Sequence, residues 1–376
     1  MTRKSSDISR RTALSLLAGA SAAASMGVSK SAFAQAPFDL AGKEVNLMIP
    51  FGPGGGSNFH GRLYAAALEQ TLPGKPRIVA KNVDGGGSIR GTNEFDKNAE
   101  ADGLWILEIS GSTLVNSIFK DPSINYNLVD YEAFLSSPSG SIVFGRSDHA
   151  GGLSEDPVAN VKKFIATPPT IAVQTITSSD IGMLLSYDLL GIKPKVIWGI
   201  GLGESRAGIE RNEFQMRHDT TASFAEEVKP LVEAGKVKLL FAMGFEQGGK
   251  IVRDPNVPDT PHFLEMYEAV HGKKLSGLEY DVWKSLFDTR VMGGKMLLLP
   301  PKTPAHIIEA YSKATAEGLK LPSMTDDKAK LIIGNYPQSV GADAKRILTS
   351  ALTIKPEHMQ WLREWAAKTH NQTIRG

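Results

Sequence analysis

Cysteine is absent from the 376-residue sequence, which excludes disulfide bonds, thiolate nucleophiles, zinc–thiolate sites and iron–sulfur clusters. An excess of positive charge is also missing outside the first 34 residues. The net charge is +2, but residues 1–34 contribute +4, so the remainder carries −2 and offers no basic face for nucleic acid. No segment after residue 34 is long and apolar enough to span a membrane. The composition therefore predicts a soluble protein that binds no nucleic acid.

Motifs for metals and nucleotides are also missing. The eight histidines show no spacing typical of metal ligands. None of the glycine-rich loops matches the G-x-G-x-x-G pattern of dinucleotide sites. Residues 244–250 (GFEQGGK) nearly match a phosphate-binding loop, but Ile251 follows where that loop requires serine or threonine. We therefore expect no metal and no cofactor.

Residues 1–34 have the pattern of a signal peptide. The paired arginines at residues 10–11 precede an uncharged stretch at residues 13–29, which carries four serines and is too polar to span a bilayer. Residues 32–34 (AFA) form a small-residue cleavage site. The paired arginines favour the twin-arginine route over the general secretory route. We therefore expect cleavage near Ala34 and a periplasmic mature protein.

Apolar runs of strand length alternate with longer amphipathic segments along the chain, which is typical of α/β proteins. The segment 121–141 contains prolines, serines and asparagines, and we interpret it as a crossing between two lobes. The proline-rich segment 254–261 marks the return. We expect an inserted lobe at residues 138–259 and a discontinuous lobe formed by residues 35–137 and 260–376. The expected strands are residues 44–51, 77–83, 104–110, 170–176, 195–200, 214–217, 237–243 and 295–299, and the expected helices are residues 58–72, 180–190, 204–211, 222–234, 262–270, 304–319 and 356–368, with a further helix after residue 88.

Five of these strands end in loops rich in glycine, serine or threonine. The loops lie at residues 52–58, 84–88, 111–113, 177–179 and 201–203. Open α/β sheets bind ligands at the carboxyl ends of their strands, and helix starts attract anions through free N–H groups. One such loop is more often only a turn, but five of them together favour a cleft lined with neutral donors for a small carboxylate.

A histidine–aspartate pair, His218 and Asp219, follows the strand expected at residues 214–217. Such a pair can act as a general base with its orienting acid. No matching nucleophile is visible in the sequence, so we interpret the pair as ligand contacts or loop packing and expect no catalytic residue. Arg217 could pair with a second carboxylate of the ligand through its fork of donors, or be a solvated charge at the strand end.

Two glycine-rich segments, residues 50–58 (PFGPGGGSN) and 81–88 (KNVDGGGS), follow the first two strands. They resemble two motifs of the substrate-binding receptors of tripartite tricarboxylate transporters, the Bug family. These motifs are Pro-(Phe/Tyr)-x-Pro-Gly-Gly-x-x-Asp, whose aspartate is replaced here by Asn58, and Glu-Asn-x-Pro-Gly-Ala-Gly-Gly. Shorter matches follow in the family's order at residues 101–104, 234–240, 255–259 and 300–304.

The resemblance implies a type II-like periplasmic-binding-protein fold with two lobes, each a mixed sheet flanked by helices, and a cleft between them. It implies a monomeric receptor that closes on a small organic carboxylate, holds it with backbone amides of the first two glycine-rich loops, and delivers it to membrane permease subunits. Residues 174–180 and 199–205 depart from the family's second-lobe motifs, so we expect the inserted lobe to discriminate between ligands. The expected ligand-binding residues are Gly54, Gly55, Gly56, Ser57, Asn58, Gly86, Gly87, Ser88, Ser112, Thr113, Thr177, Ser178, Ser179, Gly201, Arg217, His218 and Asp219.

Two other functions fit the same sequence features. A sensory receptor of the same fold would present its ligand to a membrane kinase, and neighbouring permease genes would separate it from a transport receptor. An exported hydrolase would use His218 and Asp219, and turnover of a carboxylic ester or amide would reveal it.

Overall fold

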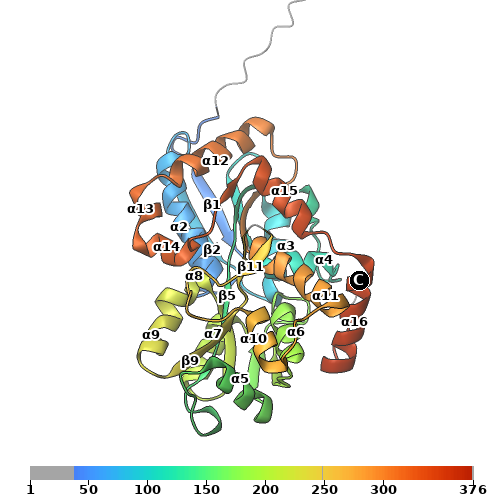
Figure 1. The fold of residues 1–376 in the computed structure, drawn as a ribbon. Coiled ribbons are helices and arrows are strands. Elements are labelled where there is room, and N and C mark those ends of the chain that lie inside the picture. Colours follow the sequence, from blue (N-terminus) through green and yellow to red (C-terminus); the bar gives the residue numbers. More distant parts are fainter. Residues whose placement is uncertain (1–37, 248, 375–376) are drawn as a thin grey trace, which may run out of the picture. The chain divides into compact units, whose positions relative to one another are not determined.

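The computed structural model describes residues 38–247 and 249–374 of the chain. The signal peptide and the cleavage site expected within residues 1–34 lie outside the described residues. Strands and helices alternate along most of the described range, so the expected α/β architecture is confirmed (Figure 1).

The largest sheet places four carboxyl strand ends at one edge. It consists of β1 (Glu44–Ile49), β2 (Arg77–Asn82), β3 (Trp105–Ser110), β4 (Glu132–Ser137), β12 (Lys295–Leu299) and β13 (Ser339–Val340), in the spatial order β13-β4-β12-β3-β1-β2. Strand β1 pairs in parallel with β2 and β3, whereas β12 runs antiparallel between β3 and β4. The first residue of β12, Lys295, therefore lies opposite Ser110 at the end of β3.

Helices cover both faces of this sheet because successive side chains of a strand point to opposite sides. Val45, Leu47 and Ile49 of β1 pack with α2 (Gly56–Thr71) and α12 (Ala305–Gly318). Met48 lies on the other face, in a cluster that also contains residues of α3 (Ile89–Asn98) and α15 (Ala342–Ala351). At the edge where β1 and β3 end, the sheet is bordered by the loops that lead into the following helices.

Three smaller sheets lie within residues 141–252. In the first, β5 (Ser141–Arg146) pairs antiparallel with β8 (Met216–Thr220) and with β9 (Val237–Ala242). The second pairs β6 (Thr170–Val173) in parallel with β7 (Lys195–Trp198). The third is a hairpin of β10 (Phe245–Gln247) and β11 (Lys250–Val252), which occupies the segment similar to a phosphate-binding loop. All three lie within the range expected for the inserted lobe, whose boundaries stay a prediction.

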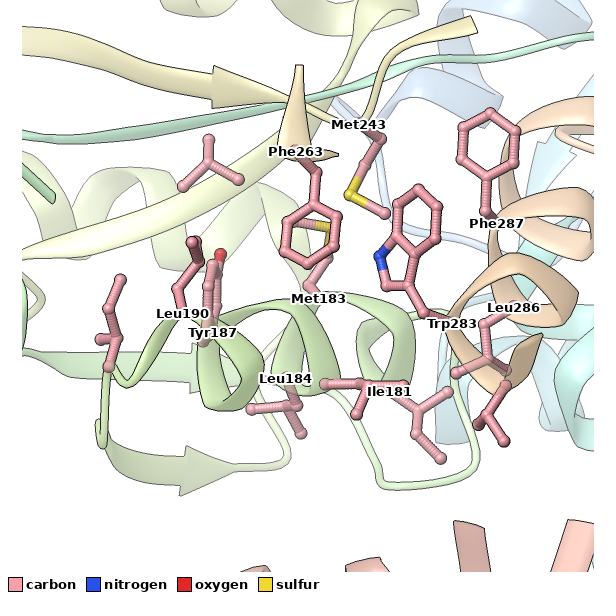
Figure 2. Close-up of a cluster of buried hydrophobic side chains, with 14 of the residues drawn as sticks. Ile181, Met183, Leu184, Tyr187, Leu190, Met243, Phe263, Trp283, Leu286 and Phe287 are labelled. Carbon is pink, nitrogen blue, oxygen red and sulfur yellow. The ribbon is translucent and has the colours of Figure 1, made fainter. Parts of the chain in front are cut away.

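The largest hydrophobic cluster joins α6 (Asp180–Leu190) to helices from the last third of the chain (Figure 2). Trp283 of α11 (Gly277–Phe287) stacks on Phe263 of α10 (Phe263–His271), with 4.7 Å between ring centroids. Its indole N–H donates to Ser186 Oγ of α6 at 3.0 Å. Residues on both sides of the expected lobe boundary at residue 259 therefore share one core.

The sequence prediction missed several elements. The clearest is β4, a buried central strand within the segment 121–141, so the link from the first sheet to β5 is only residues 138–140.

No helix in the described part of the chain is long and apolar enough to cross a bilayer. The remaining elements are α4 (Gly111–Ile118), α5 (Pro157–Ala166), α7 (Leu202–Glu210), α8 (Thr221–Ser223), α9 (Lys229–Glu233), α13 (Pro322–Thr325), α14 (Asp327–Ile333), α16 (Pro356–His370), the 3-10 helices η1 (Gly86–Ser88), η2 (Leu128–Asp130) and η3 (His149–Gly151), and the π-helical segments η4 (Phe224–Val228) and η5 (Asp288–Met292).

Candidate functional site

A cavity of about 360 Å³ lies where β1 and β3 end and β12 begins. Its volume is within the range of sites that bind small molecules. Loops from both the first sheet and the smaller sheets contribute to its wall. The lining residues are Phe51, Gly52, Pro53, Gly55, Gly56, Ser57, Asp84, Ser110, Ser112, Gln174, Ser179, Gly201, Gly203, Glu204, Thr220, Arg290 and Lys295.

Four helices of eight residues or more begin at this wall. Their N-cap residues are Gly55 for α2, Ser110 for α4, Ser179 for α6 and Gly201 for α7. The first N–H groups of a helix have no partner within the helix, and the helix dipole makes its start positive. The wall therefore presents backbone donors and positive potential, which suit an anion.

Segments far apart in the sequence meet beside the cavity. The hydroxyl oxygens of Ser112 and Ser179 lie 2.8 Å apart, and the Ser179 N–H donates to Ser112 Oγ at 3.2 Å. The Arg206 guanidinium donates to the Gly54 carbonyl at 3.4 Å. Polar contacts thus connect the starts of α2 and α4 with α6 and α7.

Lys295 places a buried amine in the wall. Its side chain is 4% exposed, and its Nζ donates to Ser57 Oγ at 2.9 Å. Burial disfavours the charged form and lowers the pKa of Lys295 from 10.5 to about 8. Among its neighbours, Glu108 raises that pKa and Arg290 lowers it. The amine therefore lies beside the start of α2 and is close to its titration range at neutral pH.

Arg290 places a second buried cation in the wall. It belongs to η5 and is 3% exposed. Its Nε and Nη2 atoms are buried and have no hydrogen-bond partner among the described residues. Burial lowers the pKa of Arg290, whereas the carboxylates of Asp180 and Asp219 raise it. Buried donors are almost always paired in folded proteins, so the two guanidinium nitrogens without a partner make Arg290, which lines the cavity, a candidate contact for an acceptor.

The two acidic lining residues lie nearer to solvent than the two cations. Asp84 and Glu204 are exposed, whereas Arg290 and Lys295 are buried. The charge of the wall is therefore polarised, with positive groups deep in the cavity and negative groups at its opening. Within the described residues there is no cluster of three or more side chains suited to hold a metal ion.

The structure places six of the expected ligand-binding residues on the cavity wall, and they are Gly55, Gly56, Ser57, Ser112, Ser179 and Gly201. Eight others do not line the cavity, and for two of them the side-chain oxygen is hydrogen-bonded elsewhere. Asn58 Oδ1 accepts from Arg62 Nε at 2.9 Å, and Thr177 Oγ1 donates to Asp121 at 3.1 Å. This group, which does not line the cavity, comprises Gly54, Asn58, Gly86, Gly87, Ser88, Thr113, Thr177 and Ser178.

The loop at residues 86–88 differs most from the expectation, because only Asp84 of the second glycine-rich loop reaches the cavity. Gly87 has a positive φ of 62°, and its carbonyl accepts from Asn116 Nδ2 at 2.9 Å. A Cβ at Gly87 would lie 3.3 Å from Ser178 Cβ. This loop therefore packs against α4 and the start of α6.

The three expected binding residues on β8, Arg217, His218 and Asp219, are buried among charged side chains and do not line the cavity. Asp219 accepts from Arg206 at 2.8 Å and from Arg217 at 2.9 Å. Arg217 is 2% exposed, and its guanidinium lies 5.7 Å from the Phe144 ring centroid. The carboxylate beside His218 is Asp180, at 3.2 Å. The idea that Asp219 orients His218 as a base is therefore wrong, because Asp219 is held by two arginines.

Sequence reasoning did not find Arg290 or Lys295. Lys295 begins the apolar run KMLLL, and Arg290 lies just before two glycines. Each is a single charge next to a buried segment, which is only a weak signal. Gln174 and Thr220 were missed for the same reason, since nothing local distinguishes them from other polar residues at strand ends.

The chain was compared with curated proteins, solved structures and protein-family profiles. It is 25% identical over 301 residues to the UPF0065 protein in the TAR-I ttuE-ttuC′ intergenic region of Agrobacterium vitis, covering 79% of this chain and 78% of that protein. It is 34% identical over 89 residues to protein BugT of Bordetella pertussis, covering 23% of this chain and 26% of that protein. No protein-family profile matches the chain.

Solved structures share the fold. The periplasmic binding protein BugD superposes with a TM-score of 0.62 at 18% identity, covering 87% of this chain and 97% of BugD. MatC of Rhodopseudomonas palustris, solved with bound malate, gives a TM-score of 0.61 at 18% identity, covering 85% of this chain and 98% of MatC. The fold is therefore the expected two-lobed fold of periplasmic solute-binding proteins. With the ordered motifs, the similarity to the A. vitis protein and to BugT, and the shared fold, this chain is similar to the Bug family, the substrate-binding receptors of tripartite tricarboxylate transporters.

Proposed function

We propose that this chain is an exported receptor that captures a small organic carboxylate in the cavity and delivers it to the permease subunits of a membrane transporter. It acts in the periplasm as a soluble monomer, after removal of residues 1–34, and it releases its ligand chemically unchanged. The cavity is the cleft between the expected lobes, residues 35–137 with 260–376 and residues 138–259.

The observation that carries this proposal is the meeting of four helix starts at one cavity. The positive ends of the dipoles of α2, α4, α6 and α7 favour a bound anion there. The wall also carries four serine hydroxyls that can donate or accept, from Ser57, Ser110, Ser112 and Ser179. Such a wall can hold a carboxylate without carrying out chemistry on it.

The relatives support the same ligand class. MatC of R. palustris was solved with malate, and a second R. palustris structure, at a TM-score of 0.60 and 16% identity, was solved with adipate. Both molecules are small organic carboxylates. The cavity of this chain has the volume to take a ligand of this kind.

A thermal-shift screen of the mature protein against organic acids tests the proposal. A ligand at 100 times its dissociation constant adds about 2.7 kcal/mol to the free energy of unfolding, which is a clear rise in melting temperature. Calorimetric titration of each hit should give one site per chain, and the recovered ligand should be unaltered by mass spectrometry. A panel of mono-, di- and tricarboxylates that raises no melting temperature would refute the proposal, as would consumption of the ligand.

A further inference from the structure

The two cations of the wall lie beside different helix starts. Lys295 donates to Ser57, in the first turn of α2. The backbone of Arg290 lies against the start of α4, since a Cβ at Gly111 would be 3.2 Å from Arg290 Cα and 3.5 Å from Ser179 Cβ. The wall therefore has two places where a buried cation lies beside a helix start.

The Arg290 guanidinium has no competing partner for two of its nitrogens. Other buried arginines nearby are ion-paired within the protein, since Arg206 and Arg217 both donate to Asp219, and each leaves only one buried nitrogen without a partner. Arg290 feels the charge of Asp180 and Asp219 but forms no described hydrogen bond through Nε or Nη2. An arginine fork pairs best with a carboxylate that accepts two parallel hydrogen bonds.

We propose that Lys295 and Arg290 bind the two anionic groups of a small dicarboxylate through direct ion pairs, Lys295 beside the start of α2 and Arg290 beside the starts of α4 and α6. The inference rests on the proposed function, because it names the ligand class and the specificity-determining residues of the same cavity. It places selectivity in residues that the sequence motifs do not include.

The exposed carboxylates of Asp84 and Glu204 also favour binding of both ligand carboxylates deep in the cavity. A dicarboxylate held with one group at the opening would meet these two negative charges. A dicarboxylate with both groups beside the buried cations avoids that repulsion. A monocarboxylate leaves one cation without a partner, so the site should bind it more weakly than a dicarboxylate of equal length.

The experiment compares matched acids on matched variants. The probes are succinate, glutarate and adipate, each paired with the monocarboxylate of the same carbon number, butyrate, valerate or hexanoate. The variants are Arg290→Gln and Lys295→Gln. Controls are Arg211→Gln and Lys320→Gln, which remove the same charges from exposed ion pairs whose residues do not line the cavity. Calorimetry gives the dissociation constants, and unliganded melting curves report folding.

The wild type should bind its best dicarboxylate at least ~10-fold more tightly than the matched monocarboxylate, because each charge-assisted bond contributes a factor of this order or more. Arg290→Gln and Lys295→Gln should each weaken the dicarboxylate ~10- to 100-fold and remove most of that preference, whereas the controls keep it. Should Arg290→Gln fail to fold, Arg290→Lys retains the charge, loses the fork and should give an intermediate loss.

Three outcomes would overturn the inference while leaving the proposed function standing. The first is carboxylate binding with equal affinity in the cavity variants and the controls. The second is an equal loss for mono- and dicarboxylates, which would mean that the cations supply only a general positive potential. The third is sulfate binding more tightly than any dicarboxylate, which would place both cations at one anionic group. Absence of all carboxylate binding in the wild type would instead refute the proposed function.

Discussion

Replacing Lys295 with methionine should change how the stability of the protein depends on pH. Methionine keeps much of the length of the lysine side chain but removes the amine, which is buried at the start of β12. Three charged groups act on this amine from other elements: Glu108 on β3, Arg290 on η5 and Asp219 on β8. Burial outweighs the two carboxylates, so the pKa of Lys295 falls from 10.5 to about 8.

The sign follows from proton binding in the two states. Between about pH 8 and pH 10.5 the lysine of the unfolded chain is protonated, whereas that of the folded protein is largely neutral. The unfolded state thus binds more protons, and the free energy of unfolding rises with pH in this window. The penalty for burying the charge is fully present below about pH 8 and is relieved as the pH rises. At ~1.36 kcal/mol per pH unit, the change between pH 7 and pH 10 is about 2–3 kcal/mol.

Urea unfolding of the wild type and Lys295→Met at pH 7, 8, 9 and 10 measures this effect. The stability of the variant minus that of the wild type should fall by about 2–3 kcal/mol over this range, because other titrations largely cancel in the difference. The matched control is Lys320→Met, whose exposed side chain should give a difference that does not vary with pH. A constant difference for Lys295→Met would refute the claim that burial lowers the pKa of this amine.

Three further predictions concern packing, the cavity wall and the buried charges. Gly91→Ala should lower the free energy of unfolding by ~1–3 kcal/mol, because a Cβ there would lie 2.5 Å from a backbone carbonyl oxygen. In the control, Gly182→Ala, the nearest contact of the Cβ is 3.7 Å, so urea unfolding should show no change or a gain of up to ~1 kcal/mol. Gly55→Val should weaken carboxylate binding by ~100-fold in calorimetry with only a small loss of stability, since its Cβ would meet nothing closer than 3.6 Å but would enter the cavity wall; unchanged affinity would move the site. Asp219→Asn should cost ~3–5 kcal/mol in the unfolding free energy, because it removes the carboxylate that pairs with buried Arg217, whereas Arg206 keeps its pair with Glu227. Glu213→Gln, in an exposed pair, should cost nothing measurable, and equal effects would contradict the burial argument.

The sequence predicted elements well where the local pattern was strong. The range 180–190 is the helix α6 as found, because an apolar segment ends at Gly191, which adopts the left-handed conformation that glycine allows. The range 295–299 is strand β12 as found, because it is a short continuous apolar run. Strand β8 was expected at residues 214–217 but comprises Met216–Thr220. Four of these five residues are polar although all five are buried, so an apolar pattern could not locate the strand.

Strand β4 shows a second limit of local patterns. Its sequence EAFLSS ends in two serines and is followed by Pro138, features more typical of a loop. In the structure it lies between β12 and β13, and Ser136 and Ser137 are buried. A polar residue in a central strand is tolerated when residues from other elements surround it. Those residues are distant in the sequence, so a local sequence pattern cannot reveal them.

The same reasoning separates the half of the site that could be predicted from the half that could not. Glycine and serine at strand ends are local signals, so the sequence located the starts of α2, α4, α6 and α7. Lys295 reaches the cavity only because β12 pairs antiparallel with β3, which is far away in the chain. This pairing cannot be inferred from the spacing of residues in the sequence, so the two buried cations of the cavity wall were not predicted.

Whether a buried charged side chain has an ion-pair partner within the protein, more than its residue type, indicates whether it stabilises the fold or binds a ligand. Arg206 and Arg217 are buried but share the carboxylate of Asp219, so removing that carboxylate leaves Arg217 without an ion-pair partner in the core. Arg290 is buried to a similar degree, yet two of its nitrogens face no acceptor within the described residues. An unpaired buried donor costs about 1–3 kcal/mol, a cost that a ligand carboxylate would remove on binding. The role that the sequence suggested for Arg217, pairing with a second carboxylate, is therefore better placed at Arg290.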